Sequence, residues 1–186
     1  MTTVRALVSV GALAIAIAAV VPSPANAEVL GQSPSGFLVR SAATIAAPPD
    51  SVYDALVGHI GDWWDPAHTY SRDSQNLSLD ARPGGCFCEA LPNGGGVRHL
   101  EVVYVVPGKT LRMTGGLGPL QAMGVAGSMT WSCEAAGDST KAEMTYSVGG
   151  YFGEGAEKLA PLVDGVLREQ LMRLKAYAET GEPGRK

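Results

Sequence analysis

The densest group of side chains able to do chemistry lies in the segment HIGDWWDPAHTYSR, which runs from His59 to Arg72. It contains two tryptophans, two histidines, two aspartates, one tyrosine and one arginine. Tryptophan offers a large apolar surface with one donor, and histidine or aspartate can orient a bound polar group. We therefore predict that this segment lines the mouth of a ligand pocket. In the alternative interpretation, Trp63 and Trp64 fill one end of the core and the polar residues are solvated.

Acid and base candidates are few. One tuned acid or base in a dry cavity is enough for proton transfer, and His68, Asp65 and Tyr146 are the candidates for that role. Ser71 lies near His68 and Asp65, but no Gly-x-Ser-x-Gly turn presents it, so we do not predict a nucleophilic triad. His59 falls on the apolar side of its predicted helix and is expected to be a core histidine.

Four residues of metal-ligating type could lie on neighbouring strands, namely Cys86, Cys88, His99 and Cys133. Sulfur with imidazole suits zinc or copper(I). Their spacing matches no compact ligand loop, and if Phe87 faces inward, both neighbouring cysteines point away from the interior. We therefore predict no metal site and no cofactor.

The odd number of cysteines allows at most one disulfide within the chain. Cys86 and Cys88 are two residues apart, which in an extended strand puts their Cα atoms close to the ~7 Å limit for bridging. A bond between them needs local distortion, which Gly84 and Gly85 would allow. The pairing stays open from the sequence alone.

Residues 1–27 have the pattern of a secretory signal peptide. Arg5 precedes the apolar run Ala6–Val21, and Ala25-Asn26-Ala27 offers a cleavage site before Glu28. The apolar run is shorter than the ~20 residues that a transmembrane helix needs. We predict a periplasmic or secreted protein with no stable membrane span after cleavage, in a compartment where disulfides persist.

The rest of the chain predicts one domain at residues 37–180, after a flexible leader at 28–36 and before a disordered tail at 181–186. Phe37–Ala46 is typical of a strand and ends at two prolines. Apolar residues then recur at helical spacing up to Trp63, with a break near Gly58 or Gly61.

From residue 75 to residue 151 apolar and polar residues alternate, and short turns separate the runs. This is typical of antiparallel strands with one buried face. Leu159–Ala178 carries one apolar stripe and predicts a long helix ended by Gly181. The order predicts an α+β fold, in which a curved antiparallel sheet of about seven strands wraps on a long C-terminal helix, with two short helices after the first strand.

A long helix on a curved sheet leaves a cavity unless large side chains fill it. Strand alternation places Arg98 on the same face as Leu100 and Val102, so we expect Arg98, rather than His99, to face the cavity and meet an anionic group. The predicted ligand-binding residues are Trp63, Trp64, His68, Tyr70, Arg98, Met113, Met129, Trp131, Met144 and Tyr146.

Composition excludes one class of partner. The chain has 14 Lys and Arg against 18 Asp and Glu, a net charge of -4, and 6% aromatic residues. It has no basic stripe to neutralise a phosphate backbone, so we do not expect nucleic-acid binding.

The order of elements and several short motifs resemble the START-like, or SRPBCC, superfamily of helix-grip proteins. The motifs are Ala46–Leu56 between first strand and first helix, Asp62-Trp63-Trp64-Asp65, Pro83-Gly84-Gly85, Val106-Pro107-Gly108 and the stripe 159–174. They are most similar to the branch of polyketide cyclases and chaperone-ATPase activators. The resemblance implies a hydrophobic cavity that binds lipids, sterols, polyketides or aromatic compounds, and catalysis in some members. A cytosolic chaperone partner does not fit an exported protein.

Together these features favour an exported protein that holds a hydrophobic, amphipathic or aromatic small molecule between the sheet and the C-terminal helix, without chemistry. One alternative is a cofactor-free cyclase or dehydratase that uses acid and base residues of segment 59–72. The other alternative is a protein-interaction module that uses an exposed Trp63–Trp64 surface, with a partner that the sequence does not identify.

Overall fold

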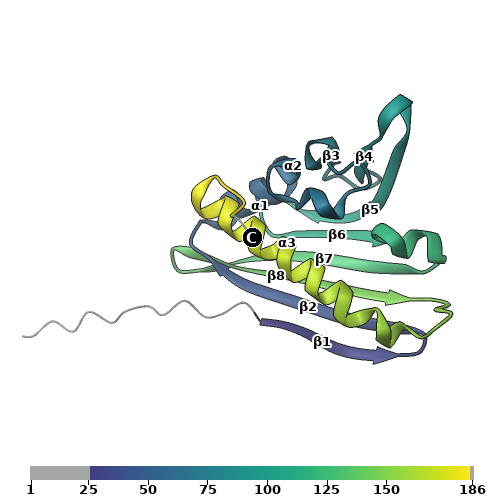
Figure 1. Ribbon diagram of the computed structural model, residues 1–186. Helices are drawn as coiled ribbons and strands as arrows, with labels where there is room; N and C mark the ends of the chain where they lie inside the picture. The colour runs from purple at the N-terminus through teal and green to yellow at the C-terminus, as the bar shows by residue number, and fades with distance from the viewer. Residues whose placement is uncertain (1–25, 185–186) are drawn as a thin grey trace, which may run out of the picture.

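The scaffold is one eight-stranded antiparallel sheet, which Figure 1 shows with the C-terminal helix lying across it. The computed structural model describes residues 26–184. Along the sheet the strands follow the order β1-β2-β8-β7-β6-β5-β4-β3. The strands are β1 (Asn26–Ser33), β2 (Gly36–Ile45), β3 (Leu77–Leu79), β4 (Cys86–Ala90), β5 (Gly96–Val106), β6 (Thr110–Gly115), β7 (Ala126–Ala136) and β8 (Ser139–Gly149).

Three α-helices and five short 3₁₀ segments complete the described chain. The helices are α1 (Pro49–Gly58), α2 (Ile60–Trp63) and α3 (Ala160–Thr180). The 3₁₀ segments are η1 (Pro66–His68), η2 (Ser74–Asn76), η3 (Pro92–Gly94), η4 (Gly118–Met123) and η5 (Ala156–Lys158). This arrangement confirms the predicted α+β helix-grip fold.

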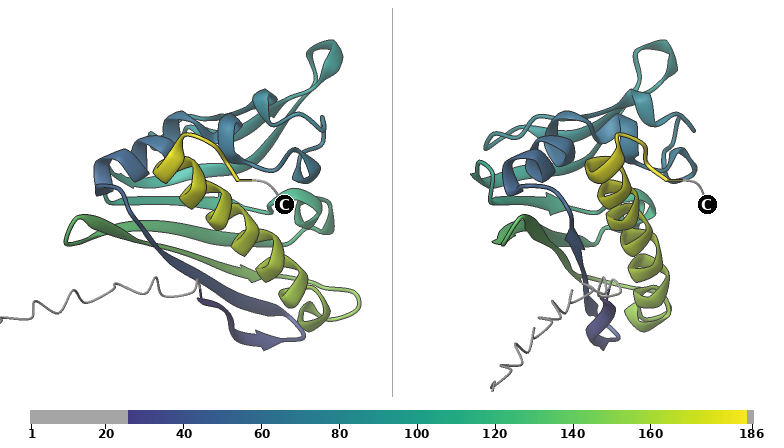
Figure 2. Two further views of the ribbon diagram at one scale, coloured as in Figure 1. Left: turned by 60° about the vertical axis from the view of Figure 1, so that its left-hand side comes forward. Right: turned by 90° about the vertical axis from the view of Figure 1, so that its left-hand side faces the viewer.

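Helix α3 crosses one face of the curved sheet diagonally in the left view of Figure 2, and the right view shows it alongside the sheet. Its first turn contains Pro161, and it ends at Thr180; the C-cap residue Gly181 has a φ of 80°, a left-handed conformation that glycine adopts freely. Leu167, Leu171 and Leu174 form the fully buried stripe that the sequence predicts. Within residues 26–184, no helix combines the length and apolar character that crossing a membrane requires.

Residues 28–36, which we expected to form a flexible leader, provide most of β1 and the turn into β2. Composition alone does not predict this strand. It forms because the outer edge of β2 carries backbone groups that need hydrogen-bond partners. β1 pairs with it antiparallel and supplies the eighth strand of a sheet predicted to have about seven. The predicted signal peptide lies outside the described residues, apart from Asn26 and Ala27 at the start of β1.

The break between the first two helices explains why our expectation for His59 is wrong. Helix α1 ends at Gly58, so the helical phase is lost and the His59 side chain is 45% exposed. Its Nδ1 lies 3.0 Å from Asp62 Oδ2, and the Tyr177 hydroxyl donates to the same carboxylate oxygen. His59 therefore belongs to a surface polar cluster.

Cys86 and Cys88 form a disulfide across a Cα–Cα distance of 5.4 Å. Phe87 between them is buried, so both sulfurs lie on the outer face of β4, as the alternation predicts. The bond also removes two of the four sequence candidates for metal ligation.

Thiol titration checks this cysteine assignment. Cys133 is 5% exposed, and burial raises the pKa of its thiol to about 11. We expect no thiol to react with Ellman's reagent in the native protein and one per chain after denaturation, because the thiolate is the reactive form. Three reactive thiols in denaturant without reductant would contradict the disulfide.

Candidate functional site

A cavity of about 380 Å³ lies under the N-terminal half of α3. Its walls come from β4, β5, β8, η4, α3 and the loop that follows α2. The lining residues are mostly apolar: Trp64, Ala67, His68, Thr69, Tyr70, Phe87, His99, Leu117, Gly118, Pro119, Leu120, Met123, Tyr146, Leu159, Leu162, Val163, Val166 and Leu167.

The cavity lies at this end because the two halves of α3 are packed differently. The C-terminal half presses Leu171 and Leu174 fully into the core. In the N-terminal half, Val163 and Val166 are only partly buried, and Leu162 is 66% exposed. No bulky neighbour fills the space beneath these valines, so a hollow with an open rim remains.

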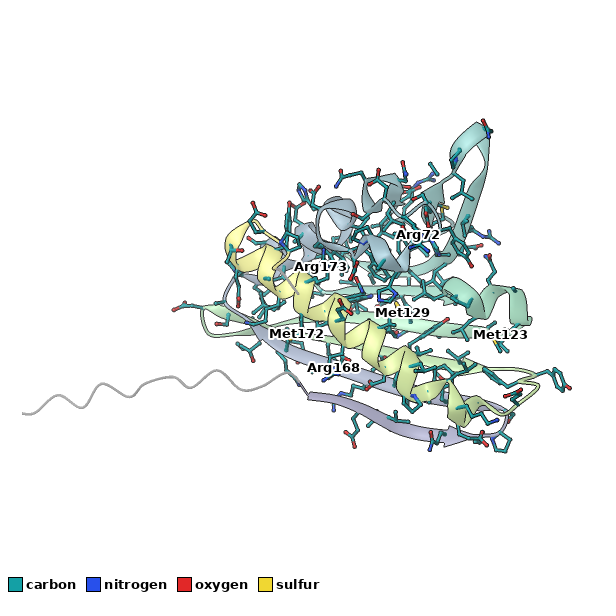
Figure 3. All side chains as sticks on the ribbon, in the orientation of Figure 1. Arg72, Met123, Met129, Arg168, Met172 and Arg173 are labelled. Carbon is teal, nitrogen blue, oxygen red and sulfur yellow. A yellow bond between two sulfur atoms is a disulfide. The ribbon has the colours of Figure 1, made fainter. Side chains whose placement is uncertain are left out.

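The loop after α2 is fixed to α3 at its beginning. Arg173 Nε donates to the carbonyl of Trp63 across 2.7 Å, and Figure 3 labels this arginine on α3. Gln170 is fully buried, and its Oε1 accepts from the Asp65 backbone amide at 2.9 Å. The Trp64 indole in turn donates to the carbonyl of His68. These bonds hold one wall of the cavity in place.

A buried acid–histidine pair fixes the other end of the loop. Glu89 on β4 is 2% exposed and accepts hydrogen bonds from the backbone amides of Tyr70 and Ser71. His99 on β5 is 4% exposed, and its Nε2 lies 3.0 Å from Glu89 Oε2. A charge this deeply buried is stable only when it is well hydrogen-bonded.

Burial and hydrogen bonding set the charge states of this pair. Burial favours the neutral form of Glu89, but the hydrogen bonds from Ser71, Tyr70 and His99 outweigh it and lower the pKa of the carboxyl. Burial lowers the pKa of His99 by more than the neighbouring Glu89 raises it. At neutral pH the carboxylate is therefore ionised and the imidazole is neutral.

These shifts predict a fall in stability on acidification. Both pKa values are lower in the folded protein, so the stabilisation is fully present above the unfolded values, about 6.5 for His and about 4.3 for Glu. This stabilisation is lost as the pH falls through the pKa values that the two groups have in the folded protein. Calorimetry should show Tm falling below about pH 6.5 and falling further below about pH 4.3. Tyr151→Ala, at the exposed surface, should keep this profile, and a Tm that stays constant from pH 7 to pH 4 in the wild type would contradict the prediction.

The prediction that Arg98 faces the cavity is wrong, and a β-bulge is the reason. Phe87 pairs with Leu100 and Cys88 pairs with Arg98, which leaves His99 as the extra residue of β5. A bulge breaks the alternation of faces, so His99 and Leu100 are both buried. Arg98 is exposed and forms an ion pair with Glu101.

Four predicted ligand-binding residues line the cavity, namely Trp64, His68, Tyr70 and Tyr146. The other inward-facing candidates belong instead to the solid part of the core, where α1 and α2 close one end of the sheet. Figure 3 labels Met129, which is 1% exposed, and Met123, which lines the cavity. The packed candidates are Trp63, Met113, Met129, Trp131 and Met144.

Trp63 and Trp64 are 0% and 4% exposed, so they form no surface for a protein partner. Their rings pack with centroids 5.5 Å apart. Trp63 fills the core, as the alternative interpretation of this segment states, whereas Trp64 also lines the cavity.

The Tyr146 hydroxyl is committed to the fold. It donates to the carbonyl of Gly115 at 2.8 Å and accepts from the amide of Leu117 at 3.0 Å. Burial raises the pKa of this hydroxyl to about 12. Tyr146 therefore holds the chain leading into η4 against the sheet and stays protonated at neutral pH.

Asp65 and His68 lie together with Glu169 of α3, and their ligand-type atoms are all within 4.8 Å of one another. Asp65 Oδ1 caps η1 by accepting from the Ala67 amide, and His68 Nε2 is 3.8 Å from Glu169 Oε2. Two carboxylates and one imidazole are donors that suit Zn²⁺. The same contacts hold the loop on α3.

A curved antiparallel sheet gripping one long helix, with an apolar cavity between them, defines a helix-grip protein. The family model described as polyketide cyclase / dehydrase and lipid transport matches residues 37–179, and the protein belongs to this family. The match confirms the resemblance drawn from the sequence motifs.

Solved structures share the fold at low sequence identity. CalU16 from Micromonospora echinospora has a TM-score of 0.58 at 16% identity, covering 87% of this chain and 88% of that chain. A protein from Rhizobium leguminosarum has a TM-score of 0.56 at 21% identity, covering 84% and 99%. The Aha1 dimer from Colwellia psychrerythraea has a TM-score of 0.53 at 21% identity, covering 77% and 97%. A comparison with curated proteins finds no significant match.

Proposed function

We propose that this protein is exported and that its cavity binds one small apolar molecule without transforming it. The observation that carries the proposal is the hollow of about 380 Å³ beneath α3, within the ~300–1,000 Å³ typical of ligand pockets. Its lining is mostly apolar, which suits a hydrophobic or aromatic ligand. The exposed rim residues Tyr70, Met123 and Leu162 give the ligand a way in.

Native mass spectrometry of the protein purified from its source tests binding. We expect one retained small molecule per chain, or a rise in Tm with members of a library of lipids, sterols and aromatic compounds. Ligand at 100 times its Kd stabilises the folded state by about 2.7 kcal/mol, which a thermal scan resolves. If no small molecule is retained and no compound of the library raises Tm, the proposal is refuted.

Export is tested separately, by N-terminal sequencing of the protein from its source. We expect the mature chain to begin at Glu28. Cleavage there removes only Asn26 and Ala27 from the described part of β1, so the pairing of this strand with β2 survives. An intact N-terminus in the cytoplasmic fraction would contradict export and leave the cavity proposal standing.

A proton-transfer enzyme of cyclase or dehydratase type is the second candidate. It is favoured by one observation: His68 lines the cavity and lies beside the carboxylates of Asp65 and Glu169. Turnover of a cavity-bound compound that disappears in His68→Ala, with binding retained, would support catalysis. Unchanged turnover in that variant and in Asp65→Asn would exclude these residues as acid or base.

A further inference from the structure

We infer that His99 is the hydrogen-bond acceptor of the cavity, and that its ligand presents a hydroxyl donor to Nδ1 of this residue. The inference rests on the proposed binding function and adds the kind of polar group that the ligand carries. Its basis is a buried, oriented imidazole in the wall of an apolar cavity.

The tautomer of His99 follows from its partner. The Glu89 carboxylate already accepts from two backbone amides and has no hydrogen to donate, so Nε2 of His99 carries the proton between them. A neutral imidazole with a protonated Nε2 has a lone pair on Nδ1. His99 thus offers an acceptor at Nδ1, and Glu89 fixes that assignment.

Nδ1 has no hydrogen-bond partner within residues 26–184, and it is so completely buried that a ligand must displace a neighbouring side chain to reach it. The buried Tyr146 hydroxyl has two partners, and the Thr69 hydroxyl, which is only partly buried, donates to a backbone carbonyl. A buried acceptor without a donor costs free energy. A ligand hydroxyl would supply that donor at an otherwise apolar surface.

The ring is held in place by its neighbours. Tyr70 stacks on His99 with centroids 5.9 Å apart, and Phe87 packs with centroids 4.9 Å apart. Because Glu89 also fixes Nε2, the imidazole is already oriented before a ligand binds, which lowers the entropic cost of binding. The same carboxylate sets a negative charge beside the site, so carboxylate ligands are disfavoured relative to neutral alcohols and phenols.

The test compares 2-naphthol with 2-methoxynaphthalene, which has the same rings but no donor, on the full chain. Fluorescence titration should show that the wild type prefers the naphthol, and that this preference falls about tenfold in His99→Phe. The expected weakening is specific to the naphthol, since Phe keeps an apolar wall. Circular dichroism checks that the variant is folded.

A second measurement needs no variant. In the ¹⁵N spectrum of histidine-labelled wild type, Nδ1 of His99 should have the shift of an unprotonated nitrogen, and naphthol should move it while methoxynaphthalene moves it less. If both compounds bind with equal affinity and leave Nδ1 unmoved, His99 is not the acceptor, although the cavity still binds ligands. If neither compound binds, the cavity proposal fails and this inference fails with it.

Discussion

Val163→Phe should weaken the binding of an apolar ligand by roughly 10- to 100-fold. Val163 lines the cavity from α3 and is only partly buried, so a larger side chain can enter the hollow without displacing the fully packed stripe. The ligand must then share the cavity with the larger phenylalanine ring. Overpacking of this kind typically costs about 1–3 kcal/mol, here of binding free energy. Titration with the neutral fluorescent probe 1-N-phenylnaphthylamine measures the loss.

Val57→Phe is the matched control, because Val57 on α1 is also partly buried against the core but does not line the cavity. It should leave the affinity within about twofold of wild type. Equal losses in the two variants would show that the effect arises from general destabilisation. An unchanged affinity in Val163→Phe would show that the probe binds elsewhere.

Trp63→Ala should destabilise the folded protein by about 3–5 kcal/mol, the usual cost of removing a large aromatic side chain from a core. Trp63 is 0% exposed and packs edge-on against Trp131 with centroids 6.3 Å apart. Its indole also donates to the carbonyl of Ala55 at 2.8 Å, so truncation leaves that acceptor unpaired. Urea denaturation followed by circular dichroism measures the change in the free energy of unfolding.

The control for this variant is Tyr151→Ala, since Tyr151 is 83% exposed. Its effect should stay within about 0.5 kcal/mol, as for most surface substitutions. A loss below about 1 kcal/mol for Trp63→Ala would contradict the placement of this ring in the solid end of the core.

Much of the fold could be predicted from periodicity. The period of two in residues 75–151 and the apolar stripe of α3 follow directly from which face each element buries, and both are observed. The strand formed by residues 28–33 could not be predicted in this way. It forms because β2 has an edge to pair with, which is a property of the assembled sheet.

The site was predicted less well, because strand alternation assumes an unbroken ladder. The bulge at His99 reverses the expected faces of Arg98 and His99, and a single sequence carries no clear sign of it. Glu89 could have been found: it shares its parity with the inward-facing Phe87, so its carboxylate had to be buried and paired. That signal was overlooked.

The extent of the cavity also could not be predicted from the sequence. Met113, Met129 and Met144 face inward as predicted, but whether an inward side chain meets a void or a neighbour depends on where α1 and α3 lie. The lining contributed by η4 was missed for the same reason, since Leu120 lies in a segment without periodicity.

The most direct test of a ligand-binding cavity beneath α3 is an NMR titration of methyl-labelled protein with naphthalene. The methyl groups of Leu120, Val163 and Leu167, which line the cavity, should shift and saturate at one molecule per chain. Those of Val52 and Leu56, in the solid end of the core, should stay unchanged. No saturable shift at the lining methyl groups, or equal shifts throughout the protein, would contradict the account.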